Sequence, residues 1–453
     1  MTNKVKNFAG VKCFAIMLLL RELYLFAMYL NLNGVYYVGT GSYGIEFVPQ
    51  KEVLGSLVFL ILDYFYSFRK IEGKFKNILL MELFILYIIP MSCSYSLMNM
   101  SDAFFVEISL FCFLLLWAIE KKGKYAFVIN NKELLHVEKS DTKKILSHPW
   151  VSLFCITCCI AVIAYKVLYN GFSLDILLGS EALYDNRAIR SLDVSNADGT
   201  LLGYFITLIS NLTSYIIPIY LFLSIKEKKY FSIIISSLSI HCSYSVSSEK
   251  STIMIIGVVF VVAWCSKKND ITLYEKLLIG GVLIGLVYSI LFWFVTKRQS
   301  TLFMLIFRRL MYLPSWLNTL YYKFFAINPK VWWSQNTMLL QKIIPDVYNT
   351  SPIALISAYY FKGVIPTPNT GLFADAYMNL GVLGIIVYPL LYKFTFNAAQ
   401  KIYSGYGWEI EVLVATKLVL ALTNVQFLRS NFVISFVFSM LLLHFLTKLN
   451  KKI

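Results

Sequence analysis

The chain has 453 residues, of which 58% are hydrophobic and 15% are charged. A water-soluble chain of this length would form about two or three domains with a far more polar composition, so these values exclude an ordinary soluble protein. The formal net charge is +16, but most lysines and arginines lie in short loops between apolar runs, a pattern typical of cytoplasmic loops rather than of nucleic-acid binding.

The apolar runs are each roughly 15–22 residues long, which is enough to cross a bilayer as a helix. They are continuously apolar rather than alternating, so we expect helices and not a β-barrel. The sequence therefore predicts an all-α, polytopic integral membrane protein with about twelve transmembrane helices in a single membrane domain over residues 1–453. In chain order the expected spans are Val11–Leu30, Val53–Phe68, Ile78–Leu97, Ala103–Ile119, Trp150–Leu168, Leu201–Ile225, Tyr230–Ser245, Thr252–Cys265, Leu277–Val295, Leu372–Leu391, Ile410–Val425 and Phe432–Leu446.

The distribution of lysine and arginine predicts the orientation of these spans. Every expected cytoplasmic turn carries Lys or Arg, so we expect both termini in the cytoplasm. Two loops then lie on the outer side of the membrane, a smaller one over residues 169–200 and a large helical one over residues 297–371. Within the first span, Arg21 and Glu22 are adjacent and could form a local ion pair.

The large loop begins with a helical pattern. Its apolar residues recur at alternating spacings of four and three, which predicts one apolar helix face. These residues are Ile306, Leu310, Leu313, Leu317, Leu320 and Phe324. Pro314 falls within the pattern and predicts a kink or two abutting helices. Arg308, Tyr312 and Trp316 share a neighbouring stripe, which either anchors an interfacial helix or faces a substrate with phosphate and sugar groups.

Cations outside the membrane run against the usual bias and are therefore informative. We expect at least three of them to form one site for an anionic ligand. The candidates are Arg187, Arg190, Lys250, Arg298, Arg308 and Arg309.

Polar residues open the expected span at Leu372–Leu391. Asp375, Tyr377 and Asn379 cannot all lie on one helix face, so at least one of them is structural. Asp375 is expected nearest to the outer water and is the preferred substrate contact. A general base, if the reaction uses one, could be Asp375, Glu249, Asp185 or His241, among which the sequence does not choose.

Several of these motifs resemble a known family. The segment Arg308-Arg309-Leu-Met-Tyr312-Leu-Pro314, the pairs Tyr321-Tyr322 and Phe324-Phe325, and the polar residues between Asn369 and Gly384 are similar to those of Wzy-type O-antigen polymerases. The turn Ser247-Ser248-Glu249-Lys250 lies where relatives often carry small residues and a basic residue. The resemblance covers the whole topology and implies a GT-C-like architecture.

The resemblance also implies a function in lipopolysaccharide biosynthesis. Such a glycosyltransferase joins oligosaccharide repeat units carried on undecaprenyl pyrophosphate at the periplasmic face, without a metal or another cofactor. It would work among membrane lipids, with a chain-length regulator of the inner membrane as a possible partner and without nucleic acid. Arg187, Arg190, Arg298, Arg309 and Asp375 are then the expected catalytic residues, with His241 or Glu249 as alternative bases. The expected substrate-binding residues are Lys250, Arg308, Tyr312, Trp316, Tyr377 and Asn379.

Two other functions fit the same pattern. A lipid-linked oligosaccharide flippase or another polysaccharide transporter also needs about twelve helices and cations for a lipid pyrophosphate. An O-antigen ligase shares the chemistry but transfers the glycan to another acceptor.

Overall fold

The structure is a computed structural model that describes residues 3–37, 40–69, 73–119, 149–170, 215–247, 250–334, 343–361, 368–404, 406–428, 436, 437 and 439. These residues form helices and connecting turns, and they contain no β-strand. The expected all-α fold class is therefore confirmed. The described helices are α1 Asn3–Leu32, α2 Pro49–Ser67, α3 Lys74–Leu83, η1 Phe84–Ile88, α4 Ile89–Leu97, α5 Asp102–Ile119, α7 Pro149–Asn170, α10 Tyr230–Ser247, α11 Lys250–Lys267, α12 Ile271–Thr296, η4 Phe303–Tyr312, α13 Leu313–Ile327, α15 Pro352–Tyr360, α16 Phe373–Leu380, α17 Val382–Tyr403 and α18 Trp408–Asn424.

Five helical stretches in the described part of the chain are long and apolar enough to cross a membrane. They are Gly10–Leu32, Lys74–Leu97, Asp102–Ile119, Ile271–Thr296 and Val382–Tyr403. Several shorter apolar helices accompany them, among them Tyr215–Lys226 and Met254–Lys267. This pattern is that of a membrane protein, whereas the total of about twelve spans remains a prediction. The last expected span, Phe432–Leu446, lies almost entirely outside the described residues.

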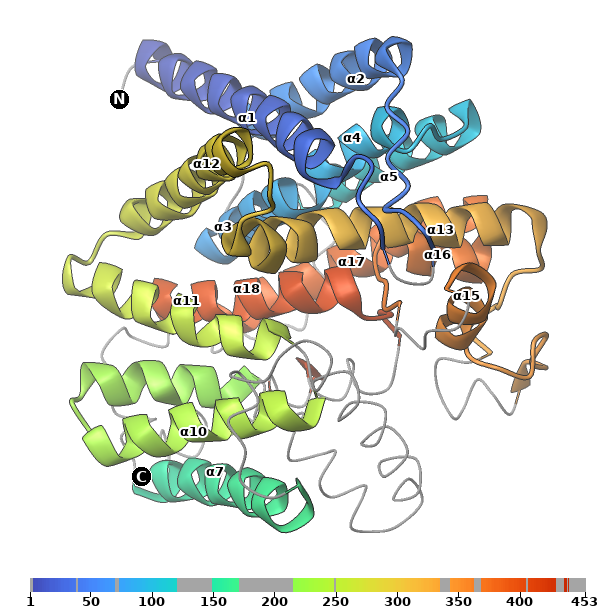
Figure 1. The fold of residues 1–453 in the computed structure, drawn as a ribbon. Coiled ribbons are helices and arrows are strands. Elements are labelled where there is room, and N and C mark those ends of the chain that lie inside the picture. Colours follow the sequence, from blue (N-terminus) through green and yellow to red (C-terminus); the bar gives the residue numbers. More distant parts are fainter. Residues whose placement is uncertain are drawn as a thin grey trace, which may run out of the picture. The chain divides into compact units, whose positions relative to one another are not determined.

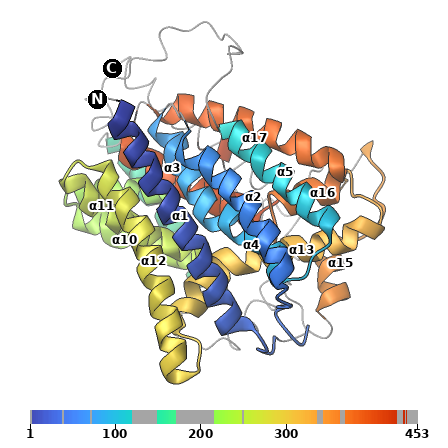
Figure 2. The same cartoon turned by 90° about the horizontal axis from the view of Figure 1, so that it is seen from above.

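The chain folds into two compact units. The first is built from Met1–Ala126, Glu275–Ala398 and Ala421–Arg429. Its helix α2 packs against α1, α4 and α5, and Figure 2 shows α1, α2 and α4 running alongside one another. Helix α13 packs against η4, α4, α15 and α16, and Figure 1 shows α13 beside α16. The first unit therefore brings α16 against a helix that lies well before it in the sequence.

The second unit comprises Phe127–Tyr274, Ala399–Leu420 and Ser430–Ile453. Within its described residues α10 packs against both α7 and α11. Glu409 accepts hydrogen bonds from the Lys226 ammonium at 3.2 Å and from the Ser266 hydroxyl at 2.8 Å, which ties the start of α18 to this unit. The single membrane domain and the two periplasmic loops expected from the sequence remain predictions.

The expected span Leu372–Leu391 is broken in two. Its first part forms the short helix α16, and the long helix α17 begins after Gly381. Gly381 has φ +59°, a conformation that glycine adopts without the steric cost of a side chain. At Gly384 a Cβ atom would lie 2.0 Å from the Ala376 carbonyl oxygen, so only glycine allows the two helices to approach this closely.

The register of the large loop also differs from the expected one. Residues 303–312 form the π-helix η4, and α13 follows directly with Pro314 in its first turn, as expected of two abutting helices. A π-helix has more residues per turn than an α-helix, so it rotates the following side chains. As a result the first four residues of the expected apolar face, Ile306, Leu310, Leu313 and Leu317, are only half-buried, while Phe307, Met311, Ser315 and Asn318 are among the buried side chains. The last two, Leu320 and Phe324, are buried as predicted.

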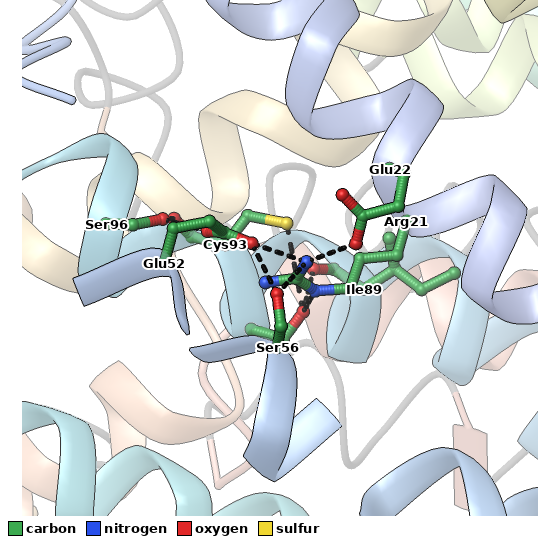
Figure 3. A network of polar contacts seen from close by, with 8 residues as sticks. Arg21, Glu22, Glu52, Ser56, Ile89, Cys93 and Ser96 are labelled. Atoms are coloured by element: carbon green, nitrogen blue, oxygen red, sulfur yellow. Dashed lines mark hydrogen bonds and ion pairs between the residues drawn. The ribbon is translucent and has the colours of Figure 1, made fainter. Parts of the chain in front are cut away.

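A polar network lies in the core formed by α1, α2 and α4 (Figure 3). Arg21 is fully buried, and its Nη1 atom lies 2.6 Å from carboxylate oxygens of both Glu22 and Glu52. Nη1 also donates to the Ser56 hydroxyl at 3.0 Å, and Ser96 donates to the other oxygen of Glu52. The expected local pair of Arg21 with Glu22 is therefore present, but Glu52 from α2 completes it.

Candidate functional site

The N-terminal end of α16 is held by side chains from two other helices. The Phe373 N–H donates to the Tyr87 hydroxyl at 3.1 Å, and the Ala374 N–H donates to Oδ1 of Asn318 at 2.8 Å. Tyr87 in turn donates to the same Asn318 oxygen at 3.3 Å. The first N–H groups of a helix have no partner within the helix, so buried side chains must accept their hydrogen bonds. Tyr87 of η1 and Asn318 of α13 thereby fix where α16 begins.

The C-terminal end of α16 is held by the turn that follows α13. The Val331 N–H donates to the Met378 carbonyl at 2.9 Å, and the Trp332 N–H donates to the Asn379 carbonyl at 3.2 Å. The Trp333 N–H donates to Oδ1 of Asn379 at 2.9 Å. The N-terminal end of this eight-residue helix is thus bound to η1 and α13, and its C-terminal end is bound to the turn after α13.

Asp375 lies in the first turn of α16 and is fully buried. Its Oδ1 atom accepts a hydrogen bond from Nδ2 of Asn379 at 2.9 Å, and Oδ2 accepts one from the Phe427 N–H at 2.7 Å. Asn379 also donates to the Tyr388 hydroxyl at 3.0 Å, and that hydroxyl accepts from Nε1 of Trp333 at 2.8 Å. Asp375 therefore positions three chain segments, and the substrate contact predicted for it remains a prediction.

Asp375 should make the stability of the protein depend on pH. Burial raises the pKa of Asp375 to about 7, whereas the ordinary pKa of an aspartate is about 4. Hydrogen bonds from Phe427, Tyr388 and Asn379 lower the pKa and so oppose part of this shift. Between these values the folded protein retains a proton that the unfolded chain releases, so the stabilisation is present below about pH 4 and lost as the pH rises through about 7. The unfolding temperature of the wild type should therefore fall by a few degrees relative to Asp375→Asn between about pH 5 and pH 8.

Thermal unfolding of the detergent-purified proteins across this pH range measures that difference. Asp102→Asn, which removes an exposed carboxylate at the start of α5, serves as the control. A gap between wild type and Asp375→Asn that stays constant with pH would contradict the buried, titrating carboxyl.

The opposite face of α16 carries Tyr377. Its ring lies 4.6 Å from that of Tyr322 on α13, and Nζ of Lys330 lies 4.8 Å from the Tyr377 ring centroid. Burial lowers the pKa of Lys330, and the negative charge of Glu107 on α5 opposes this shift. Lys330 also donates to the Phe325 carbonyl. Tyr377 and Asn379 thus face different surroundings, as their spacing predicts.

The stripe formed by Arg308, Tyr312 and Trp316 is turned toward a neighbouring segment of the same unit. Arg308 Nη1 donates to the Tyr43 hydroxyl, and Tyr312 donates to the Tyr43 carbonyl. Trp316 packs edge-on against Tyr37 with ring centroids 5.4 Å apart. Tyr312 and Trp316 are buried. These aromatic rings hold the segment before α2, and substrate binding by them remains a prediction.

Two of the expected cations differ from Arg308 in making no side-chain hydrogen bond within the part of the chain that the structure describes. Arg298 follows α12 and is exposed, whereas Arg309 lies on η4 and is half-buried. Neither guanidinium makes a hydrogen bond or an ion pair with another residue of the described ranges. No described residue therefore competes with an anionic ligand for these two guanidinium groups.

The remaining candidates lie elsewhere in the chain. Arg187, Arg190 and Glu249 are outside the described residues, as is Asp185. Lys250 begins α11, but its side chain is outside the described part. His241 is half-buried on α10 in the second unit. The structure thus brings together Asp375, Tyr377 and Asn379, and it leaves the other groupings as predictions.

Comparison of the chain with protein-family models, with curated proteins and with solved structures finds no match. The function is therefore inferred from the contacts described above and from the residues that carry the resemblance to O-antigen polymerases.

Sequence reasoning missed the residues that hold α16 in place. These are Tyr87, Asn318, Trp333, Tyr388 and Phe427. A polar residue on an otherwise apolar helix was the available signal for Asn318, because a buried amide needs a partner. No local signal could have identified the Phe427 N–H, whose partner lies 52 residues away.

Proposed function

We propose that the chain is an O-antigen polymerase of the inner membrane. It joins oligosaccharide repeat units carried on undecaprenyl pyrophosphate, and its reaction takes place at the periplasmic face with both termini in the cytoplasm. The candidate membrane spans support a membrane enzyme, and the resemblance of the segments around Arg308 and Asn369 to this family supports the reaction. A chain-length regulator in the same membrane is the proposed partner.

The observation that carries the proposal is the contrast among the arginines after α12. The guanidinium of Arg308 is engaged by Tyr43, while the guanidinium groups of Arg298 and Arg309 make no hydrogen bond or ion pair with the other described residues. The positive-inside bias disfavours arginines on the outer side of the membrane. Arginines that lie there without a partner among the described residues therefore favour a role in binding an anionic ligand. A guanidinium offers two parallel hydrogen bonds to a phosphate, which matches a pyrophosphate leaving group.

The reaction requires little more from the protein than charge and position. The hydroxyl of the acceptor sugar attacks the anomeric carbon of the donor glycan, a glycosidic bond forms, and the bond from that carbon to the pyrophosphate oxygen breaks. Undecaprenyl pyrophosphate leaves with the bonding electrons, and the hydroxyl proton passes to a base or to water. Preorganised cations stabilise the negative charge that develops on the leaving group. Arg187, Arg190 and Lys250 are proposed to add to this charge.

Purified protein in nanodiscs, supplied with lipid-linked repeat units, tests the proposal. We expect a ladder of longer lipid-linked glycans that persists in EDTA. Arg298→Ala and Arg309→Ala should each lower the rate about ten- to a hundredfold, because each removes roughly 1.5–3 kcal/mol of charge-assisted hydrogen bonding in the transition state. Lys323→Ala, which removes an exposed cation from α13, should leave the rate near that of the wild type.

Companion measurements separate the alternatives. In sealed proteoliposomes, movement of the lipid-linked unit across the bilayer without a new glycosidic bond would identify a transporter. Transfer only to a lipid A core acceptor would identify a ligase. Normal rates for both alanine variants would remove Arg298 and Arg309 from the site, and activity that EDTA abolishes and a divalent cation restores would contradict the metal-free reaction.

A further inference from the structure

The turn that holds the C-terminal end of α16 is strained. Trp332 has φ +54° and Trp333 has φ +61°. Bulky side chains rarely adopt this left-handed conformation, because the side chain then crowds the backbone. Within the described ranges the only other apolar residue with a positive φ is Leu372, which directly precedes α16. The strain of large apolar residues is therefore concentrated around one short helix.

Hydrogen bonds keep this turn in its strained shape. The N–H groups of Val331, Trp332 and Trp333 all donate to α16, to Met378 or Asn379, at 2.9–3.2 Å. The Trp333 indole donates to Tyr388 and stacks on its ring, with centroids 6.3 Å apart. Trp333 thus has a structural reason to be tryptophan.

Trp332 has no comparable structural reason. Its side chain is 47% exposed, and it makes no ring contact with any other aromatic residue that the structure describes. Glycine would adopt the same backbone conformation without strain, so packing and backbone geometry both argue against a tryptophan at this position. A large aromatic ring that is exposed, strained and held on a fixed backbone is instead arranged for contact with a ligand.

We propose that Trp332 is a saccharide-binding residue, on whose ring one sugar of the repeat unit stacks through its apolar C–H face. The inference rests on the proposed function, because a polymerase must position an acceptor glycan next to the donor. An indole offers a large, rigid contact area and loses little conformational entropy on binding. Lys330, two residues earlier, supplies a half-buried cation near the turn, beside Tyr377 and Gly381.

A membrane anchor is the other common use of an exposed tryptophan, but the geometry favours the sugar. Interfacial tryptophans need an amphipathic position at the level of the lipid head groups, which any helix or loop can supply. They do not need two successive left-handed residues or a backbone bound to a buried helix. A sugar-binding ring does gain from such a fixed position, because its orientation is set before the ligand arrives.

Trp332→Gly is the decisive variant, since it removes the ring and the strain together. We expect an unfolding temperature equal to or above that of the wild type, because glycine relieves the left-handed strain. We also expect the affinity for the repeat-unit glycan, released from its lipid by mild acid, to fall about tenfold, the loss of one aromatic contact. Trp332→Phe should stay within about threefold of the wild type, because it keeps an aromatic face.

Binding of the released glycan to detergent-purified protein, measured by calorimetry, provides the readout. Trp264→Ala on α11 is the matched control, because Trp264 is 48% exposed, much like Trp332. The affinity of this variant for the glycan should equal that of the wild type. Wild-type affinity in Trp332→Gly would overturn the proposal. Quenching of Trp332 fluorescence by brominated phosphatidylcholine vesicles, absent in Trp332→Phe, together with unchanged glycan affinity would show a membrane anchor instead.

Failure of this proposal can be told apart from failure of the proposed function. If the wild type builds polymer and Trp332→Gly builds it with an unchanged KM for the repeat unit, the polymerase stands and the subsite is wrong. If the wild type builds no polymer but binds the released glycan through Trp332, the subsite stands and the chain is a different sugar-handling membrane protein.

Discussion

Replacing Gly371 with alanine should prevent the chain from accumulating as a folded protein. A Cβ atom on Gly371 would lie 1.9 Å from the Leu422 carbonyl oxygen and 2.8 Å from that of Val425. Both contacts are with backbone atoms near the end of α18, which cannot move away as a flexible side chain could. Overpacking of this kind costs about 3 kcal/mol or more, a large fraction of the stability of a typical fold. Fluorescence-detected size-exclusion chromatography of a tagged protein measures the result.

Gly280→Ala is the matched control. Gly280 lies within α12, and a Cβ atom there would meet nothing within 4 Å. Alanine is favoured over glycine in a helix by about 1 kcal/mol, so this variant should accumulate at least as well as the wild type. A Gly371→Ala protein that elutes as a single peak at normal yield would show that the approach of α18 is looser than described.

Arg21→Met should destabilise the first unit by about 3–5 kcal/mol, because it leaves the largely buried Glu52 carboxylate without its cation. Arg21 is fully buried and lies 2.6 Å from Glu52, whose side chain is only 14% exposed. Glu22 shares the cation but is 49% exposed, so it can be solvated or can reach lipid head groups. The loss should appear as a lower unfolding temperature of the purified protein in detergent.

A second substitution tests the cause of that loss. Adding Glu52→Gln to Arg21→Met removes the stranded charge and should restore part of the stability, whereas Glu22→Gln alone should cost less than about 1 kcal/mol because it alters a half-exposed partner. If Glu52→Gln makes the Arg21→Met protein less stable, the destabilisation comes from lost packing around the aliphatic stem and not from the buried charge.

The sequence was most informative where a helix is apolar along its whole length. The expected spans Ala103–Ile119 and Leu277–Val295 end within one residue of the ends of α5 and α12, because uninterrupted apolar runs with charged ends admit few other structures. Helix α5 begins one residue before the expected span, and α12 begins six residues before it. The break at Gly381 was harder to predict, because the run Leu372–Leu391 has no proline or charge cluster at that point. Its signal was the pair Gly381 and Gly384, which acquires meaning only when α16 packs against α17.

The surroundings of α16 show why the candidate site was predicted only in part. Asp375, Tyr377 and Asn379 stood out because polar residues at the end of an apolar run are unusual. Their partners come from distant parts of the chain: the Phe427 N–H that donates to Asp375 lies 52 positions away. The π-helical turn of η4 shifted the side-chain register as well, so a 3.6-residue period selected the wrong buried residues up to Leu317 and the right ones, Leu320 and Phe324, beyond it.

The capping of α16 has a consequence for how an anionic ligand can be bound here. The start of a helix carries a partial positive charge from its aligned peptide dipoles, and proteins often use it to bind phosphate. In α16 this end is already engaged, because Tyr87 and Asn318 accept the N–H groups of Phe373 and Ala374. A pyrophosphate near α16 would find these two main-chain donors already engaged, so side chains with a full positive charge would have to meet most of its charge.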